Sequence, residues 1–385
     1  MPTLIDLLEK KKPQIAGPSG LFKKKAHQQL KALGLPSKKD GAFQYMPLLK
    51  LLQDDLQDSE KTLCEAGDVF FHNGCLVHAA HTECEMLPLG DAFTKYSAYL
   101  NHAAAGILKR ETNPFALAAS ALCEEGVFIY VPPGKQFENP ITIASQVDTS
   151  VAFHKVHILV GKGSKVTIEV DGPVQEEGTF HEFLIEGSVE MGGELSIVSK
   201  GKSAHQGYYL ESVRINQKRD SKSTYYAESV GGKASRYDAV VTLAEENAET
   251  TIEGVHELRD KNQAHTHLLV HHKAPNCRSY QHVKNGLFDS AVSSFEGKIY
   301  VEKEAQQTDA YQLNNNLVLG EKARAYSKPN LEIFADDVSA SHGSTTGQLS
   351  EEELFYLQTR GLVKSEAETL LVRAFFDEIR GKYVR

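Results

Sequence analysis

The chain contains 385 residues, enough for two or three domains, and its 41% hydrophobic and 24% charged residues are typical of a globular, soluble protein. It shows no run of roughly 18 apolar residues and no signal-peptide core, and five cysteines in so long a chain do not indicate a disulfide framework, so we expect a cytoplasmic protein. The net charge of −9 at pH 7 argues against nucleic-acid binding.

Residues 1–125 are predicted to form a mainly helical N-terminal region. Residues 21–34 place apolar side chains at helical spacing and end in a glycine. A single second helix is expected over residues 91–108. A third helix is predicted to begin after Asn113, because an N-cap residue is followed there by Pro114 at the first helical position.

One β-hairpin is predicted within this region, over residues 69–77, because Asn73 and Gly74 tolerate the positive φ angles of a type I′ turn. Five potential zinc ligands recur there at intervals of three: His72, Cys75, His78, His81 and Cys84. A period of three fits neither a strand nor a helix, and the turn would interrupt the series. The pattern therefore favours an ordinary hairpin over a metal site.

Residues 126–348 predict a core built from short strands separated by glycine and polar turns. No long amphipathic helix intervenes, which excludes an α/β fold and leaves a sandwich, a barrel or a β-solenoid. A weak repeat favours the solenoid, since similar segments align Ile168, Ile197, Tyr226 and Ile252 at intervals of 29, 29 and 26 residues. Such coils suit a parallel β-helix, in which each turn buries its apolar face against the next.

The segment THLLVHH provides a second candidate metal site. His265, His267 and His271 project to one face of the predicted strand, and such His-x-His pairs occur in metal sites. A β-helical metal-dependent enzyme using this face is therefore one functional hypothesis. The sequence contains no phosphate-binding P-loop, dinucleotide fingerprint or nucleophile elbow, so we do not expect an enzyme of those classes.

Residues 349–385 predict a C-terminal helical hairpin. Ser350 opens its first helix with a capping box, Gly361 ends that helix, and Ser365 opens the second. We expect this hairpin to cover the last coil of the solenoid and to leave surplus apolar surface for a partner. Just before it, the segment ADDVSASHGSTTG in extended geometry places Ala340 and His342 on one side.

Four blocks in this part of the chain, AQQTDAYQ, LEIFADDV, SHGSTTGQL and LFYLQTRG, occur in order with short gaps. Residues 295–362, which contain them, closely resemble the C-terminal core of the SufB/SufD family, the non-ATPase subunits of the SUF iron–sulfur cluster assembly machinery. The length and the plain helical N-terminus are similar to the SufD type. The resemblance implies a right-handed parallel β-helix with helical flanks and a scaffold subunit that is not itself an enzyme.

The resemblance also implies partners. A SufB-like paralogue would pair through the C-terminal part of the β-helix, and a SufC-like ABC ATPase, which would bind the ATP, would dock on the C-terminal helices. A homodimer of the chain alone and the involvement of a flavin remain open, and neither nucleic acid nor a membrane is expected. The residues expected to contact a partner are Leu354, Phe355, Tyr356, Arg360, Leu362 and Phe375.

His342 is the residue that the resemblance marks as a candidate ligand of iron or of a transient iron–sulfur cluster, shared with SufB. Relatives commonly carry a cysteine two positions earlier, where this chain has Ala340. Thiolate and imidazole together would suit iron–sulfur chemistry, and this chain keeps only the imidazole. We therefore expect that it holds no cluster stably by itself.

Overall fold

The computed structural model describes residues 3–37, 40–58, 66–172, 174–175, 178–201 and 207–383. The helices are α1 Leu4–Lys10, α2 Gly20–Leu33, α3 Leu48–Gln53, α4 Leu89–Lys95, α5 Ser97–Leu108, α6 Pro114–Leu122, α7 Glu351–Thr359 and α8 Lys364–Tyr383, with a 3-10 turn at Gly41–Phe43. Across these ranges, no helix is long and apolar enough to span a membrane.

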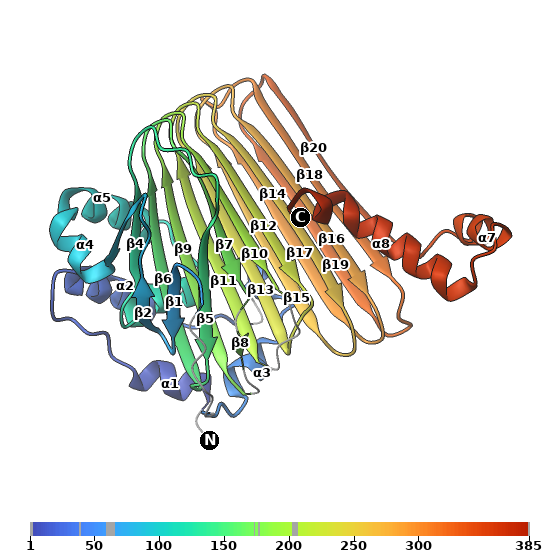
Figure 1. Cartoon of the computed structure of the whole chain (residues 1–385), viewed down its shortest axis with the longest axis horizontal. Coiled ribbons are helices and arrows are strands. Elements are labelled where there is room, and N and C mark those ends of the chain that lie inside the picture. Colours follow the sequence, from blue (N-terminus) through green and yellow to red (C-terminus); the bar gives the residue numbers. More distant parts are fainter. Residues whose placement is uncertain are drawn as a thin grey trace.

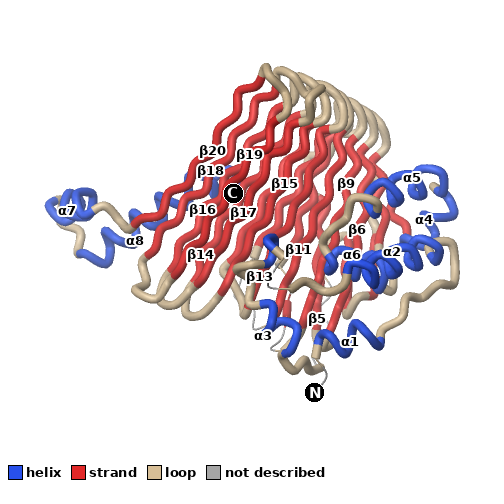
Figure 2. The backbone as a smooth tube through the Cα atoms, turned by 180° about the vertical axis from the view of Figure 1, so that it is seen from behind, coloured by secondary structure: helices blue, strands red, loops and turns tan. Residues whose placement is uncertain are grey.

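Strands dominate the chain from β4 to β20 (Figures 1 and 2). They are β1 Val69–His72, β2 Cys75–Ala79, β3 Glu85–Pro88, β4 Val127–Val131, β5 Ile141–Val147, β6 Val151–Val160, β7 Lys165–Asp171, β8 Val174–Gln175, β9 Phe180–Val189, β10 Glu194–Lys200, β11 Tyr208–Gln217, β12 Lys222–Ser229, β13 Ala234–Leu243, β14 Glu249–Leu258, β15 Gln263–His272, β16 Arg278–Leu287, β17 Val292–Val301, β18 Thr308–Val318, β19 Arg324–Ile333 and β20 Val338–Gly347.

The strands form a parallel β-helix, as predicted. Successive strands alternate between two sheets, one ordered β2-β1-β5-β7-β10-β12-β14-β16-β18-β20 and the other β19-β17-β15-β13-β11-β9-β6-β4-β3. Each coil therefore contributes one strand to each sheet, and stacking buries a continuous core between the sheets. Asparagine or aspartate with positive φ occupies several of the tight turns, for example Asp220, Asn247 and Asp260, because these residues tolerate the left-handed region.

The repeat was predicted correctly for three of its four aligned residues, and the remaining one is displaced by one position. Ile168 pairs in register with Ile197, as aligned, but the next residue of that row is Tyr225, not Tyr226, and Ile252 follows. Tyr226 points to the outer side, where its ring stacks on Tyr383 at 4.3 Å between centroids. Because both tyrosines are buried, hydrophobicity alone could not distinguish their sides.

The N-terminal elements cover one side of the solenoid. The hairpin is confirmed, with Asn73 and Gly74 both at positive φ, and its first strand also extends a solenoid sheet by pairing with β5. Asn113 caps α6 by accepting a hydrogen bond from the Phe115 N–H, as predicted. The single helix expected over residues 91–108 is instead two, because the chain leaves helical geometry at Tyr96.

The C-terminal helices do not cover the last coil, and that expectation was wrong. In Figures 1 and 2, α8 runs along the flank of the solenoid and carries α7 away from the sheets. Phe376 of α8 is fully buried against Gly286 of β16, where any side chain on the glycine would overlap the phenyl ring. The docking of α8 on this flank leaves the end of the solenoid open.

Candidate functional site

The open end of the solenoid is formed by the last two strands of the described chain. β19 pairs with β17, and β20 pairs with β18, and within the described ranges no strand pairs with their other edges. Ala310 of β18 is fully buried beneath this end, whereas Leu331, Ile333 and Ala340 of the final coil are only partly covered. Phe334 beside them is 57% exposed. Unpaired backbone and partly covered apolar side chains therefore meet at one end.

His342 lies at this open end, on the strand face that continues the core. Its register partner on β18 is Gln312, whose own partner on β16 is Gln281, and both glutamines are buried. Ala340 lies over Ala310, so Ala340 and His342 share one side of β20 as predicted. The imidazole is exposed to solvent. It can therefore reach a partner or a ligand at the end of the solenoid.

Gln312, beneath His342, was not predicted from the sequence as part of the site. Its amide Nε2 donates a hydrogen bond of 2.9 Å to Gln281 Oε1, inside the last coils. The signal that could have revealed it is the coil length, because Gln281, Gln312 and His342 follow one another at 31 and 30 residues. These intervals differ from the 29 and 26 residues of the predicted repeat, which was not extended this far.

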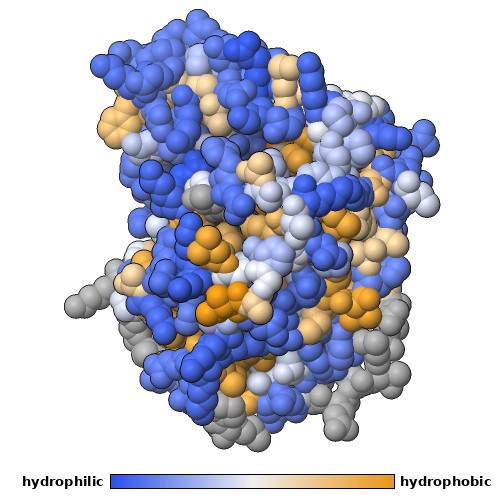
Figure 3. Space-filling model, turned by 90° about the vertical axis from the view of Figure 1, so that its left-hand side faces the viewer, coloured by the Kyte–Doolittle hydropathy of each residue, from blue (hydrophilic) through white to orange (hydrophobic). Residues whose placement is uncertain are grey.

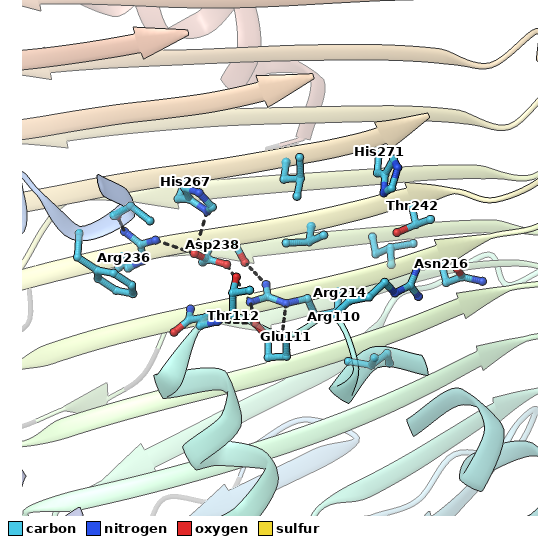
Figure 4. A pocket seen from close by; sticks show the side chains of 17 residues that line it. Arg110, Glu111, Thr112, Arg214, Asn216, Arg236, Asp238, Thr242, His267 and His271 are labelled. Carbon is cyan, nitrogen blue, oxygen red and sulfur yellow. Dashed lines mark hydrogen bonds and ion pairs between the residues drawn. The ribbon is translucent and has the colours of Figure 1, made fainter. Parts of the chain in front are cut away.

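The three histidines of β15 share one face of the strand, as predicted, and two of them, His267 and His271, line a cavity of about 150 Å³ (Figure 4). They nevertheless bond to different groups. His267 Nδ1 lies 3.0 Å from Asp238, His271 Nε2 lies 2.7 Å from a glutamate of a later turn, and His265 Nδ1 lies 2.8 Å from Ser294. In the part of the chain that the structure describes, no three histidine, cysteine, aspartate or glutamate side chains are placed to hold a metal ion.

One wall of this cavity is a buried network of ion pairs (Figure 4). Arg214 bonds to Glu111 at 2.7 Å and to Asp238 at 2.9 Å, and Arg236 reaches the same aspartate at 2.7 Å. Burial opposes ionisation of Asp238, but the positive charge of Arg214, followed by that of His267, holds its pKa well below its usual range. Because Glu111 belongs to the connection between α5 and α6, the network ties that connection to the sheet.

Among the described residues, the histidines and cysteines of the hairpin segment do not come together as a group of three that could hold a metal ion. Burial, followed by the hydrogen bond to Glu124, raises the pKa of the Cys75 thiol to about 11. Burial likewise raises the pKa of the Cys84 thiol to about 12. Without a bound metal ion, both thiols are therefore protonated near neutral pH. His72 is held by Asp148 at 3.0 Å, so the segment has the contacts of a structural hairpin.

Comparison with known proteins shows the family of the chain. Residues 142–375 match the family model described as "SUF system FeS cluster assembly, SufBD core domain". The chain belongs to the SufBD family. An iron–sulfur cluster assembly SufBD family protein of Synechocystis is 27% identical over 91% of this chain and 84% of its own length. One of Mycobacterium leprae is 30% identical over 70% of this chain and 71% of its own length.

The iron–sulfur cluster assembly protein SufD of Escherichia coli is a third relative, 24% identical over 91% of this chain and 86% of its own length. The segment matched by the SufBD family model contains the whole open end, including Gln312 and His342, and also α7. The open end of the solenoid and α7 thus lie within the segment that the family model matches.

The residues expected to contact a partner lie in two places on the C-terminal helices of this SufBD-family chain. Phe355 and Tyr356 on α7 are 69% and 56% exposed, and Arg360 stacks over the Tyr356 ring at 5.1 Å. Leu354 and Leu362, beside them, are half-buried. Phe375 lies apart, on α8, where Lys284 of β16 approaches its ring at 4.5 Å. Val363, 60% exposed beside α7, is an apolar member of this surface that sequence analysis missed.

Proposed function

We propose that this chain is a SufD-type scaffold subunit that assembles iron–sulfur clusters together with a SufB-like paralogue and a SufC-like ATPase. The similarity to SufD over most of both chains supports the SufD type. ATP would be bound and hydrolysed by the ATPase partner, so this subunit would have no catalytic site of its own. In this proposal, residues 1–125 form the N-terminal region, residues 126–348 the scaffold core and residues 349–385 the ATPase-docking part.

The observation that carries the proposal is the open end of the solenoid, with His342 on it. The free edges of β19 and β20 present backbone N–H and C=O groups that a second β-helix could pair with, extending both sheets across the contact. A SufB-like paralogue has the matching fold. A second copy of this chain could occupy the same edges when the paralogue is absent, in the cytoplasmic location that we expect.

At this contact, His342 would supply one ligand to iron or to the cluster that is being assembled. The exposed imidazole has a nitrogen lone pair suited to iron. Ala340 beside it adds only a methyl group, so the thiolate of the site must come from the SufB-like partner. A cluster would therefore be held only in the complex, and would leave it as the product of assembly.

The proposal is tested by co-expressing the chain with SufB-like and SufC-like chains of the same source and reconstituting clusters on the purified complex. We expect His342→Ala to lower cluster yield about tenfold or more, measured by absorbance and by iron and sulfide content, because even an outer-sphere partner of a ligand typically contributes that much to metal affinity. The matched control is Ser341→Ala, an exposed neighbour on the opposite side of β20.

Two results would contradict the proposal. If the three chains do not co-purify, the chain is not a subunit of such a complex. If the complex forms and His342→Ala yields as much cluster as the unmodified complex, then His342 is not a ligand and the role of the open end is only architectural. Unchanged circular dichroism of the variant excludes unfolding as the cause of a loss.

A further inference from the structure

A column of polar side chains runs inside the last three coils and ends at His342. Gln281, Gln312 and His342 occupy one register position on β16, β18 and β20. Neighbouring strands of a sheet lie about 4.8 Å apart, so side chains of one row stack directly over one another. Gln281 is 0% and Gln312 2% exposed, whereas His342 is open to solvent. The column therefore leads from the core to the candidate ligand.

The column has a direction. Gln312 Nε2 donates to Gln281 Oε1, so the amide of Gln312 uses its donor toward the preceding coil. Its acceptor atom, Oε1, is buried and has no hydrogen-bond partner among the described residues. Leaving such a carbonyl unpaired costs about 1–3 kcal/mol. The free energy of the site therefore favours any donor that can reach this oxygen.

The next coil offers few donors on that side. Ala340 has none, and the Ser344 hydroxyl already donates to Ser327 at 2.8 Å. His342 lies between them, in register with Gln312, and its side chain has no hydrogen bond or ion pair with any described residue. A neutral imidazole carries one N–H donor and one nitrogen lone pair. It is thus the group that can complete the column.

We infer that Gln312 is the positioning residue of His342, and that its Oε1 accepts a hydrogen bond from one imidazole N–H. This bond fixes the tautomer of the ring and turns the other nitrogen, with its lone pair, outward to the partner side. Groups that orient a metal-binding histidine through its second nitrogen act in this way. The inference rests on the ligand role proposed above for His342.

Gly297 supports the inference, because it makes room for the glutamine. A methyl group built on Gly297 of β17 would overlap the Nε2 atom of Gln312 and would lie 2.6 Å from its Cδ and 2.7 Å from the Phe295 ring. The absence of a side chain at Gly297 therefore leaves the space that the Gln312 amide occupies. A substitution at Gly297 can displace the amide without removing any polar group.

The experiment measures the tautomer of His342 in the isolated chain by two-bond ¹H–¹⁵N correlation NMR with ¹⁵N-labelled histidine. The His342→Ala spectrum assigns the signals. Gln312→Met removes the acceptor at nearly constant volume, and Gly297→Ala displaces it. Asn285→Leu is the matched control, because it removes a buried amide four residues further along β16, where Asn285 donates to Asn316 at 2.7 Å, and leaves Gln312 in place.

In the unmodified chain and in Asn285→Leu, we expect one tautomer of His342 to predominate. In Gln312→Met and Gly297→Ala, we expect the ratio to return to that of the same histidine in the urea-unfolded chain. Within the reconstituted complex, Gln312→Met should lower cluster affinity about tenfold or more. A ratio that is equal in the unmodified chain, in Gln312→Met and in the unfolded chain would overturn the inference.

The two proposals fail differently. If His342→Ala impairs cluster formation but Gln312→Met changes neither the tautomer ratio nor the yield, His342 is a ligand that Gln312 does not position, and this inference alone is wrong. If His342→Ala leaves the yield normal, the ligand role is wrong. The inference that Gln312 positions a ligand is then also wrong, whatever the tautomer ratio shows.

Discussion

A few buried charged residues connect the solenoid to the N-terminal helices that pack on it. Lys155 of β6 bonds to Glu186 of β9 at 2.9 Å, and His157 reaches the same carboxylate at 2.8 Å, with all three side chains nearly inaccessible. Burial by itself would raise the pKa of Glu186, but the charge of Lys155 and the contact with His157 together outweigh it, and the pKa falls to about 2. Lys155 also donates to Ser120 of α6 at 3.2 Å, which links the pair to the helix.

Replacing Lys155 with methionine should lower the free energy of unfolding by about 3–5 kcal/mol, because it leaves a buried carboxylate without its main counter-charge. Urea denaturation near pH 7 measures the change. The control is Lys298→Met, whose partner Glu332 lies on the surface and whose pair is 37% and 45% exposed, so the expected cost is below about 1 kcal/mol. Equal losses in the two variants would contradict this account.

Among the elements, α7 extends away from the sheets and exposes most of its surface. None of its described side chains is buried, and it lies beyond the sheets at the outer end of α8 (Figure 1). In contrast, the face that carries α4 and α5 shows mainly hydrophilic side chains, with small and separate hydrophobic patches (Figure 3). Because α7 exposes Phe355 and Tyr356 and buries none of its side chains, it contributes little to the stability of the fold and is suited to binding a partner.

We expect Phe355→Ser to weaken binding of the SufC-like ATPase about 30-fold, the effect of losing one aromatic anchor of about 2 kcal/mol at an interface. Titration calorimetry with the purified ATPase measures it. Leu21→Ser is the control, because Leu21 is a 63% exposed apolar residue on α2, at the other end of the molecule. Unchanged affinity in Phe355→Ser, or an equal loss in Leu21→Ser, would place the ATPase contact elsewhere.

At the scale of the whole molecule, several histidines are buried within or against the solenoid. Burial lowers the pKa of His154, His265 and His272 to about 3 and that of His256 to about 4, from an ordinary value of 6.5. Below pH 6.5 the unfolded chain therefore binds protons that the folded chain does not. Glu182 and Glu211 oppose this effect, because burial raises the pKa of both carboxyl groups, that of Glu182 to about 8, and both release a proton on unfolding.

The four histidines outnumber the two opposing carboxyl groups, so stability should be greatest above pH 6.5 and fall as the pH decreases toward 4. Each unbalanced proton contributes up to about 1.4 kcal/mol per pH unit. We expect the free energy of unfolding, from urea titrations at pH 7.0, 6.0 and 5.0, to decrease by several kcal/mol over this range. His256→Gln should reduce the slope of this free energy against pH by the contribution of about one proton. A free energy of unfolding that stays constant or increases as the pH is lowered would contradict the prediction.

Much of the fold could be predicted from local signals. The N-cap of α6 at Asn113, the hairpin turn at Asn73 and the end of α2 at Gly34 each depend on a few adjacent residues. The break at Tyr96 was missed because the residues around it are compatible with a continuous helix. The candidate site was predicted only at His342, through the family blocks, since an imidazole on a strand has no distinctive spacing.

The strand-rich core, the helical ends and the family can be recognised from the sequence alone, because turn residues, caps and motif blocks act over short distances. Only the tertiary structure decided that Gln312 lies under His342 and that α8 leaves the solenoid end open. The physical reason is that coils vary from 27 to 31 residues, as the rows from Ile168 to His342 show. With no constant period, the stacking of backbone hydrogen bonds, and not spacing along the chain, places one side chain over another.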